Sequence, residues 1–458
     1  MSAPSAPTLS RPGARPVAPP RRHCRRAAAV LLATLLASGG ARAQATLSLD
    51  QALQRAAQRS RQLASQEAAA SSERERAVAA GQRPDPTLEV GIDNLPVDTQ
   101  DRFSLTRDFM TMRTVGVMQE LTRGAKLAAR SARYERAADT ALAERALALA
   151  RLRRDTAAAW FARYYAERVL ALVRRQRDEA VLQVDAAEAA YRGGRGAQAD
   201  VFAARSAVAQ IDDRILQAQQ QAASAQTTLA RWVGAAATQP LAEPPPLALA
   251  QADAQAGAPA AAAPPALDRH PEIVLLRRQE RQAQADAALA RADRDPDWSI
   301  ALRYSQRGPA YSNMVSVSLS VPLTLDRANR QDRELAARLA TVEQLRDQRE
   351  EAARALQAEI ARWQQAWQSD RERLAHYDHA LIPLAAERTQ AATAAYRGGG
   401  GSLAAVLDAR RAEIDVRIDR LRLQADAAER WAALEYLGPG AMAGADPSAD
   451  LATTPRER

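Results

Sequence analysis

The chain has 458 residues, a formal net charge of +9 and an aromatic content of only 4%. So few aromatic side chains, beside abundant alanine, arginine, glutamine and leucine, favour long helices over compact globular cores. The only cysteine, Cys24, excludes an intramolecular disulfide and a cysteine-based metal site.

Residues 1–43 are predicted to be a secretory signal peptide. Four closely spaced arginines precede an apolar run over residues 27–37, and Ala41, Arg42 and Ala43 form a cleavage motif. That run is too short to cross a membrane as a retained helix. The segment carries seven arginines and no acidic residue, so subtracting seven from +9 leaves about +2 for the remaining chain. This small charge, without a basic stripe interleaved with aromatic residues, argues against nucleic-acid binding.

The first structural repeat is expected over residues 44–239. Its first helix should begin at Ser48, whose hydroxyl can cap it while Gln51 reaches back, and should run to about Ala80. The repeat is completed by a β-hairpin over about 87–121, a long helix over about 125–191, a glycine turn and a return helix over about 197–233. The long helix, at roughly 65 residues and on the order of 100 Å, exceeds what a globular domain needs. The two shorter helices together match its length, so we expect them to stack end to end beside it.

A Pro- and Ala-rich linker over residues 240–266 leads to a second repeat over residues 267–438. This repeat is expected to hold a helix, a β-hairpin over about 298–323, a long helix over about 327–396 that Pro383 kinks, and a return helix over about 403–437. Residues 439–458 are predicted to form a flexible tail. The duplication is clearest where Ala-Ala-Tyr-Arg-Gly-Gly at 189–194 returns at 394–399.

The predicted strands alternate with a period of two. Val315, Val317 and Leu319 face one way, and the serines between them face the other. A transmembrane barrel strand has this pattern, and so does a half-buried strand of a soluble sheet. The long helices favour the barrel. Two hairpins supply only about four strands, whereas the smallest single-chain barrels use about eight, so closure requires two, three or four copies of the chain.

The turn motifs and the duplicated plan together resemble a known family. Tyr-Arg-Gly-Gly at 191–194 is followed by Ala199-Asp200-Val201, and its copy at 396–399 is followed by Ala405-Val406-Leu407-Asp408-Ala409. In these features, over about Ser48 to Gly438, the chain resembles the TolC-like outer membrane efflux proteins. The resemblance implies a mainly α fold with transmembrane β-structure, in which a homotrimer completes a β-barrel of about 12 strands in the outer membrane and a long helical barrel in the periplasm.

The same resemblance implies an exit channel that works with a periplasmic adaptor protein and an inner-membrane pump of the resistance-nodulation-division type. The segment Phe103–Met112 resembles the branch that exports heavy-metal cations. The same channel role for drugs or other organic compounds is the alternative. A soluble periplasmic coiled-coil adaptor or scaffold is the alternative from another class.

The resemblance also implies where the functional residues lie. The adaptor contact is expected at the periplasmic tip: Tyr191, Arg192, Gly193, Gly194, Tyr396, Arg397, Gly398 and Gly399. The glycines can also be explained by chain reversal alone. Asp200 and Asp408 are the candidate pore constriction, with Ala405 in place of the family's first acid, and rings of acidic residues favour cations. A salt bridge to Arg205 or Arg410 is the alternative role for these two aspartates.

Neither catalysis nor a bound cofactor is expected. The sequence contains no catalytic motif, and no enzyme activity is predicted. His376 and His379 have a spacing that can chelate a metal, but no third ligand is evident, so no metal site is predicted.

Overall fold

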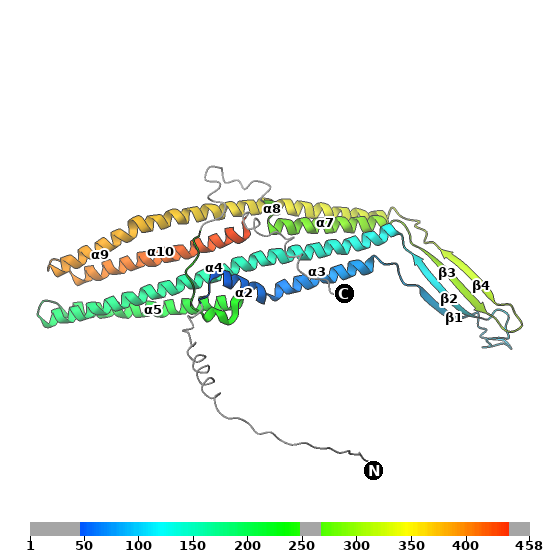
Figure 1. Cartoon of the computed structure of the whole chain (residues 1–458), viewed down its shortest axis with the longest axis horizontal. Coiled ribbons are helices and arrows are strands. Elements are labelled where there is room, and N and C mark those ends of the chain that lie inside the picture. The colour runs from blue at the N-terminus through cyan, green and yellow to red at the C-terminus, as the bar shows by residue number, and fades with distance from the viewer. Residues whose placement is uncertain (1–45, 248–266, 439–458) are drawn as a thin grey trace, which may run out of the picture. The chain divides into compact units, whose positions relative to one another are not determined.

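The computed structural model describes residues 46–247 and 267–438 (Figure 1). The predicted signal peptide, most of the linker and the predicted tail lie outside the described residues. The described elements belong to one compact unit that begins at Leu47. Among the helices in the described part of the chain, none combines the length and apolar character needed to span a membrane.

The elements follow the chain in two similar series. The first series consists of α2 (Leu49–Arg59), α3 (Arg61–Ala80), β1 (Thr87–Asp93), β2 (Met112–Leu121), α4 (Gly124–Arg192), α5 (Gln198–Val233) and the 3-10 helix η1 (Gly234–Thr238). The second series consists of α7 (Pro271–Ala292), β3 (Trp298–Gln306), β4 (Met314–Ser320), α8 (Gln331–His376), the π-helix η2 (Tyr377–Leu381), α9 (Ile382–Arg397) and α10 (Leu403–Leu437).

The first predicted helix begins where expected but is divided in two. The Ser48 hydroxyl accepts a hydrogen bond from the Gln51 backbone N–H at 3.2 Å, and Gln51 accepts one from the Ser48 backbone N–H at 3.4 Å. At Ser60 the backbone turns to an extended conformation, with φ −68° and ψ 109°, so α2 ends there. The Ser60 hydroxyl then caps α3 by accepting from the Leu63 N–H at 3.3 Å. The expectation of one continuous helix to Ala80 was therefore wrong.

The second long helix is interrupted in the turn before Pro383. A proline has no N–H, and its ring clashes with the carbonyl four residues earlier, so a regular α-turn cannot continue through it. The chain widens over Tyr377–Leu381, where the N–H of Ile382 donates to the carbonyl of Tyr377. Asp378 in this turn pairs with Arg420 of α10 at 2.5 Å. The predicted kink is thus a π-turn fastened to the neighbouring helix.

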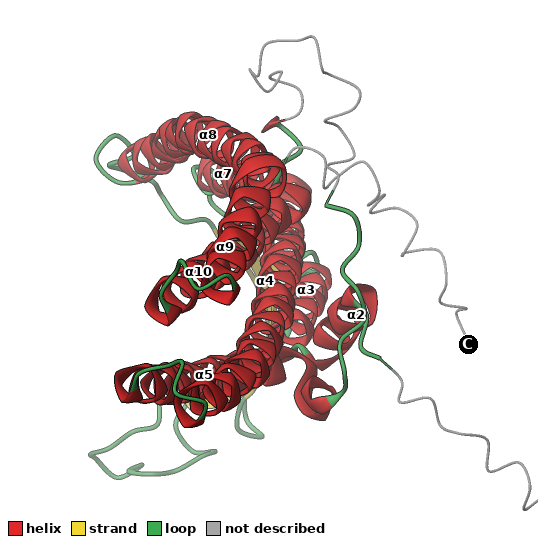
Figure 2. Ribbon diagram, turned by 90° about the vertical axis from the view of Figure 1, so that its left-hand side faces the viewer, coloured by secondary structure: helices red, strands yellow, loops and turns green. Residues whose placement is uncertain are grey.

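The helices run side by side along this unit. Figure 1 shows the strands at one end of the long helices and the two glycine turns at the other. Both α3 and α5 pack along α4, which has 69 residues, and α2 contacts both α4 and α5. Figure 2, which looks along the helices, shows them in a curved row. Such a curved row of helices, one layer thick, can bury only a small apolar core by itself.

The largest apolar cluster lies midway along the helices. Trp160 and Phe161 of α4 are almost fully buried there, and the Trp160 indole N–H donates to the Leu47 carbonyl at 3.1 Å. The buried guanidinium of Arg163 donates to the Gln239 carbonyl at 3.0 Å. Leu47 also forms a parallel bridge with Leu241, at the start of the predicted linker. These contacts join the N-terminal segment to α4 and to the chain that follows η1.

His270 is the N-cap of α7 and generates a prediction about pH. Its side chain is 3% exposed, and its Nδ1 accepts from the Glu272 N–H at 3.2 Å, which only an unprotonated Nδ1 can do. Burial lowers the pKa of His270 below its ordinary value of 6.5, and the charge of Arg151 adds to this effect. The charge of Glu272 and a hydrogen bond to the Leu437 backbone raise the pKa but do not outweigh burial. Because the folded state binds the proton less readily than the unfolded chain, the stabilisation is present above pH 6.5 and is lost as pH falls below it.

We therefore expect the melting temperature of the wild type to fall as the pH drops from about 8 to about 5. In the variant His270→Asn the amide oxygen still caps the helix but does not titrate, so this component of the pH dependence should disappear. Thermal unfolding followed by circular dichroism measures both proteins. Parallel pH profiles for the two would contradict the assignment.

Candidate functional site

The four strands form one antiparallel sheet that joins the two repeats. The order is β1-β2-β3-β4, and β2 pairs with β3 so that Val117 lies opposite Leu302. The outer edges of β1 and β4 pair with no other strand of the described residues. Both edges therefore present free backbone N–H and C=O groups.

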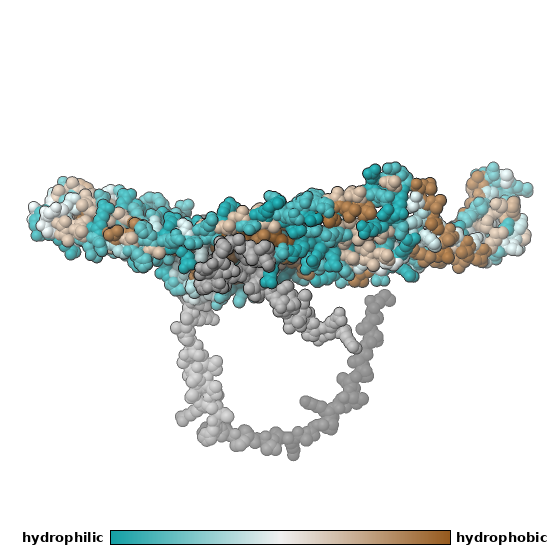
Figure 3. Space-filling view, turned by 90° about the horizontal axis from the view of Figure 1, so that it is seen from above, coloured by the Kyte–Doolittle hydropathy of each residue, from teal (hydrophilic) through white to brown (hydrophobic). Residues whose placement is uncertain are grey.

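One face of this sheet is apolar and exposed. The register places Val90 beside Val115, Val115 beside Tyr304, and Tyr304 beside Val315, so these side chains share a face. Twelve large residues on this face are 42–72% exposed: Leu88, Val90, Ile92, Val115, Val117, Trp298, Ile300, Leu302, Tyr304, Val315, Val317 and Leu319. Figure 3 shows the hydrophobic surface concentrated towards the sheet end. An exposed apolar face of this extent marks a surface for lipid or for another protein.

The opposite face is polar. Glu89, Gly116, Arg303 and Ser316 lie in one row across the four strands. Arg303 reaches over Gly116 to pair with Glu89 at 2.8 Å. A Cβ atom at Gly116 would lie 3.1 Å from the Leu302 carbonyl oxygen and 3.3 Å from the Arg303 Cβ. Glycine at this position thus leaves room for an ion pair on the polar face of the sheet.

The two glycine turns at the other end have the same geometry. Gly194 has φ +70° and Gly399 has φ +75°, a region that glycine adopts without strain. Gly193 and Gly398 have negative φ values of −83° and −79°, so the requirement for glycine falls on the second residue of each pair. Arg195 and Gly400 then donate their N–H groups to the carbonyls of Ala190 and Ala395, which closes each helix.

The remaining predicted tip residues differ between the repeats. Tyr191 is 47% exposed, whereas Tyr396 is half-buried against the cluster that contains Val201 and Leu403. Arg192 bonds Glu188 at 3.1 Å, and Glu188 also accepts from Arg205 at 2.7 Å. The hydrogen bonds from Arg205 and then Arg192 lower the pKa of the Glu188 carboxyl.

Arg397 is exposed and has no salt bridge within the described part of the chain. The two turns therefore have the same backbone geometry, but the tyrosine and arginine beside them differ in exposure and in ion pairing between the repeats.

The two candidate constriction residues occupy different environments. The Asp200 carboxylate accepts from the Ala197 N–H at 3.2 Å and so caps the start of α5. Asp408 is exposed on α10. Neither forms the salt bridge considered as the alternative, because Arg205 pairs with Glu188 and Arg410 pairs with Glu179. A pore-lining role for Asp200 and Asp408 stays a prediction.

Ion pairs across the helix pairs were not foreseen from the sequence. Arg410 of α10 pairs with Glu179 of α4, and Arg214 of α5 pairs with Asp415 of α10 at 2.8 Å. The partners are separated by more than two hundred positions, and each residue alone is one of many charged residues on its helix. No sequence pattern distinguishes them. They fasten α10 to the α4–α5 hairpin above the tip.

Comparisons with known proteins bear on the whole arrangement. Residues 262–438 match the family model described as "Outer membrane efflux protein". A search of the curated proteins finds no match to this sequence. Three solved structures are similar along nearly the full chain: the outer-membrane channel OprN (18% identity, TM-score 0.69, 86% of this chain and 90% of that chain), VceC of Vibrio cholerae (19%, 0.68, 85% and 96%) and the CmeC channel of Campylobacter jejuni (11%, 0.72, 88% and 88%).

The fold is that of the outer-membrane channels with a long periplasmic helical barrel, which confirms the predicted TolC-like fold class. The second repeat carries the match to the outer membrane efflux protein family, and the first repeat shares its plan. The family match and the exposed apolar sheet assign the chain to the outer membrane, with its helices in the periplasm.

This assignment predicts that the two faces of β4 respond differently to charge. Val317 lies on the exposed apolar face, and Ser318 lies on the other. An arginine facing lipid near the bilayer midplane costs about 2–4 kcal/mol, whereas an arginine facing water costs much less. We expect Val317→Arg to reduce the yield of folded, membrane-inserted protein strongly and Ser318→Arg to leave it near wild type. Heat-modifiable migration of extracted membranes on gels measures both, and equal losses would contradict the assigned faces.

Proposed function

We propose that this chain is the outer-membrane exit duct of a tripartite efflux pump and that its cargo is heavy-metal cations. The proposal depends on one observation: the same chain has an exposed apolar sheet and a helix of 69 residues, which is on the order of 100 Å long. The sheet suits a bilayer, and the helices suit a passage through the periplasm. A sheet-on-sheet core, as in a soluble adaptor or scaffold, would require the apolar face to be covered, and within the described residues it is not.

The proposal includes three copies of the chain. A lone four-stranded sheet in lipid leaves the edges of β1 and β4 without hydrogen-bond partners, at several kcal/mol for each unpaired group. Pairing β1 of one copy with β4 of the next removes both edges. Three copies give about twelve strands, enough to close a barrel around water.

The proposed partners are a periplasmic adaptor and an inner-membrane pump of the resistance-nodulation-division type. The adaptor would contact the two glycine turns. In support, the residues available there include the exposed side chains of Tyr191, Arg192 and Arg397. Because the turns are tight, they give a docking partner fixed points rather than flexible loops.

Two features support the proposed cargo. Asp408 offers an exposed carboxylate without a salt bridge in the described part of the chain, and a ring of such groups would favour cations. The resemblance of Phe103–Met112 to the metal-exporting branch points the same way. Drugs or other organic compounds are the second candidate, because a wide water-filled duct selects little by itself.

Growth of a deletion strain tests the cargo. Loss of the gene should sensitise cells to one or more of copper, silver, zinc, cobalt and cadmium, and the wild-type gene should restore tolerance. Asp408→Asn should restore it incompletely, because it removes a carboxylate from the proposed constriction, whereas Asp419→Asn on the same helix should restore it fully. Sensitivity to dyes and detergents alone would refute metal export, and an unchanged strain would count against efflux altogether.

A further inference from the structure

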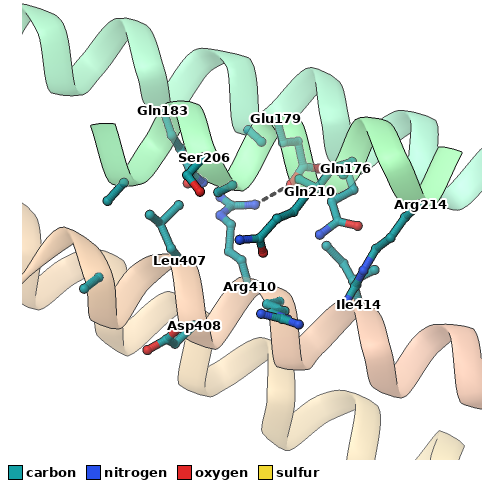
Figure 4. A pocket seen from close by; sticks show the side chains of 16 residues that line it. Gln176, Glu179, Gln183, Ser206, Gln210, Arg214, Leu407, Asp408, Arg410 and Ile414 are labelled. Atoms are coloured by element: carbon teal, nitrogen blue, oxygen red, sulfur yellow. Dashed lines mark hydrogen bonds and ion pairs between the residues drawn. The ribbon is translucent and has the colours of Figure 1, made fainter. Parts of the chain in front are cut away.

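A cavity of about 300 Å³ lies between the α4–α5 hairpin and the first turns of α10. Its polar lining comes from three helices: Gln176, Glu179 and Gln183 of α4, Ser206, Gln210 and Arg214 of α5, and Asp408, Arg410 and Arg411 of α10. In Figure 4 the side chain of Arg410 crosses this space towards Glu179, and the amide ends of Gln176 and Gln210 lie beside it. The volume falls at the lower end of the range for small-ligand sites.

Several buried polar atoms in this cavity lack hydrogen-bond partners. Gln176 is only 8% exposed, and its Oε1 bonds nothing within the described residues. The same holds for Oε1 of Gln183 and Nε of Arg410. A buried polar group without a partner costs roughly 1–3 kcal/mol. The cavity therefore contains buried polar atoms that have no hydrogen-bond partner among the described residues.

Three arginines and two acidic residues, Glu179 and Asp408, line the cavity. Of its three arginines, Arg410 is paired with Glu179 and Arg214 with Asp415, but Arg411 has no ion pair in the part of the chain that the structure describes. Asp408 also borders the cavity, yet Figure 4 shows its carboxylate turned away from Arg410. Arg411 is thus a guanidinium in the cavity lining that no ion pair occupies among the described residues.

We propose that this cavity binds a small solute through an oxyanion of the phosphate or carboxylate type. Guanidinium groups bind both oxyanions through paired, charge-assisted hydrogen bonds, and Arg411 supplies a guanidinium without an ion pair in the described part of the chain. Nε of Arg410 supplies a further donor. A glutamine amide presents either its oxygen or its NH₂ group after a half-turn, so Gln176 and Gln210 complete the set of donors. The bound anion competes with Glu179 for Arg410, so its binding is coupled to the ion pair between α4 and α10.

Calorimetric titration of the purified full-length protein in detergent tests the site with two probes, inorganic phosphate and citrate. We expect saturable binding of at least one probe, and the preferred probe identifies the oxyanion. Arg411→Ala should weaken that binding by about tenfold or more, since it removes a charged hydrogen-bonding group. Because Arg411 is exposed, this variant should fold normally. Arg417→Ala serves as the matched control, because Arg417 lies on the same helix and pairs with Glu413 outside the cavity lining.

A second variant separates binding from structure. Gln176→Leu conserves the size of the side chain but removes the unsatisfied amide, so the melting temperature without ligand should rise while the affinity for the probe falls. The proposal is overturned if neither probe binds saturably, if Arg411→Ala binds as well as wild type, or if Gln176→Leu leaves the affinity unchanged. These measurements use isolated protein, so they do not depend on export or on the identity of the cargo.

Discussion

The structure depends on one constraint: a backbone hydrogen-bonding group cannot remain unpaired in lipid. Neighbouring strands of the sheet pair their backbone groups in the order β1-β2-β3-β4, but the outer edges of β1 and β4 have no partner within the described residues. The apolar residues on one face, from Val90 to Leu319, fit a bilayer and do not fit water. In the proposed trimer, this sheet is therefore one part of a closed barrel. In the same trimer, the curved row of helices would pack against the helices of neighbouring copies.

Glycine has a different role at each end of the unit. At the sheet, Gly116 makes room for Arg303 to reach Glu89, so that the polar face carries an ion pair between strands of different repeats. At the turns, Gly194 and Gly399 adopt positive φ values so that each long helix reverses within a few residues. Between these ends, ion pairs from α10 to Glu179 and to Arg214 connect the helix pairs just above the tip. The cavity proposed to bind an oxyanion lies at this connection, where binding and helix contact share Arg410.

Periodic features could be predicted from the sequence, and features that depend on distant neighbours could not. The strand alternation around Val317 and the glycine turns follow from local pattern, because each residue's role is set by its own backbone position. The break at Ser60 was missed because serine both interrupts and caps helices, and the apolar pattern continued past it. The pore role of Asp200 stays a prediction; its carboxylate also caps α5, a role that its place in the first helical turn could have suggested. No local sequence pattern indicated the ion pair between Arg410 and Glu179.

Disulfide cross-linking between β1 and β4 tests most directly whether other copies complete the sheet. In a Cys24→Ser background, paired cysteines placed at successive positions along β1 and β4 provide a chain without competing thiols. The account predicts that some pairs join different chains under oxidation, giving a ladder that ends at three times the mass of one chain and collapses on reduction. A ladder that ends at two chains, or no link between chains at any register in membranes that contain folded protein, would contradict it.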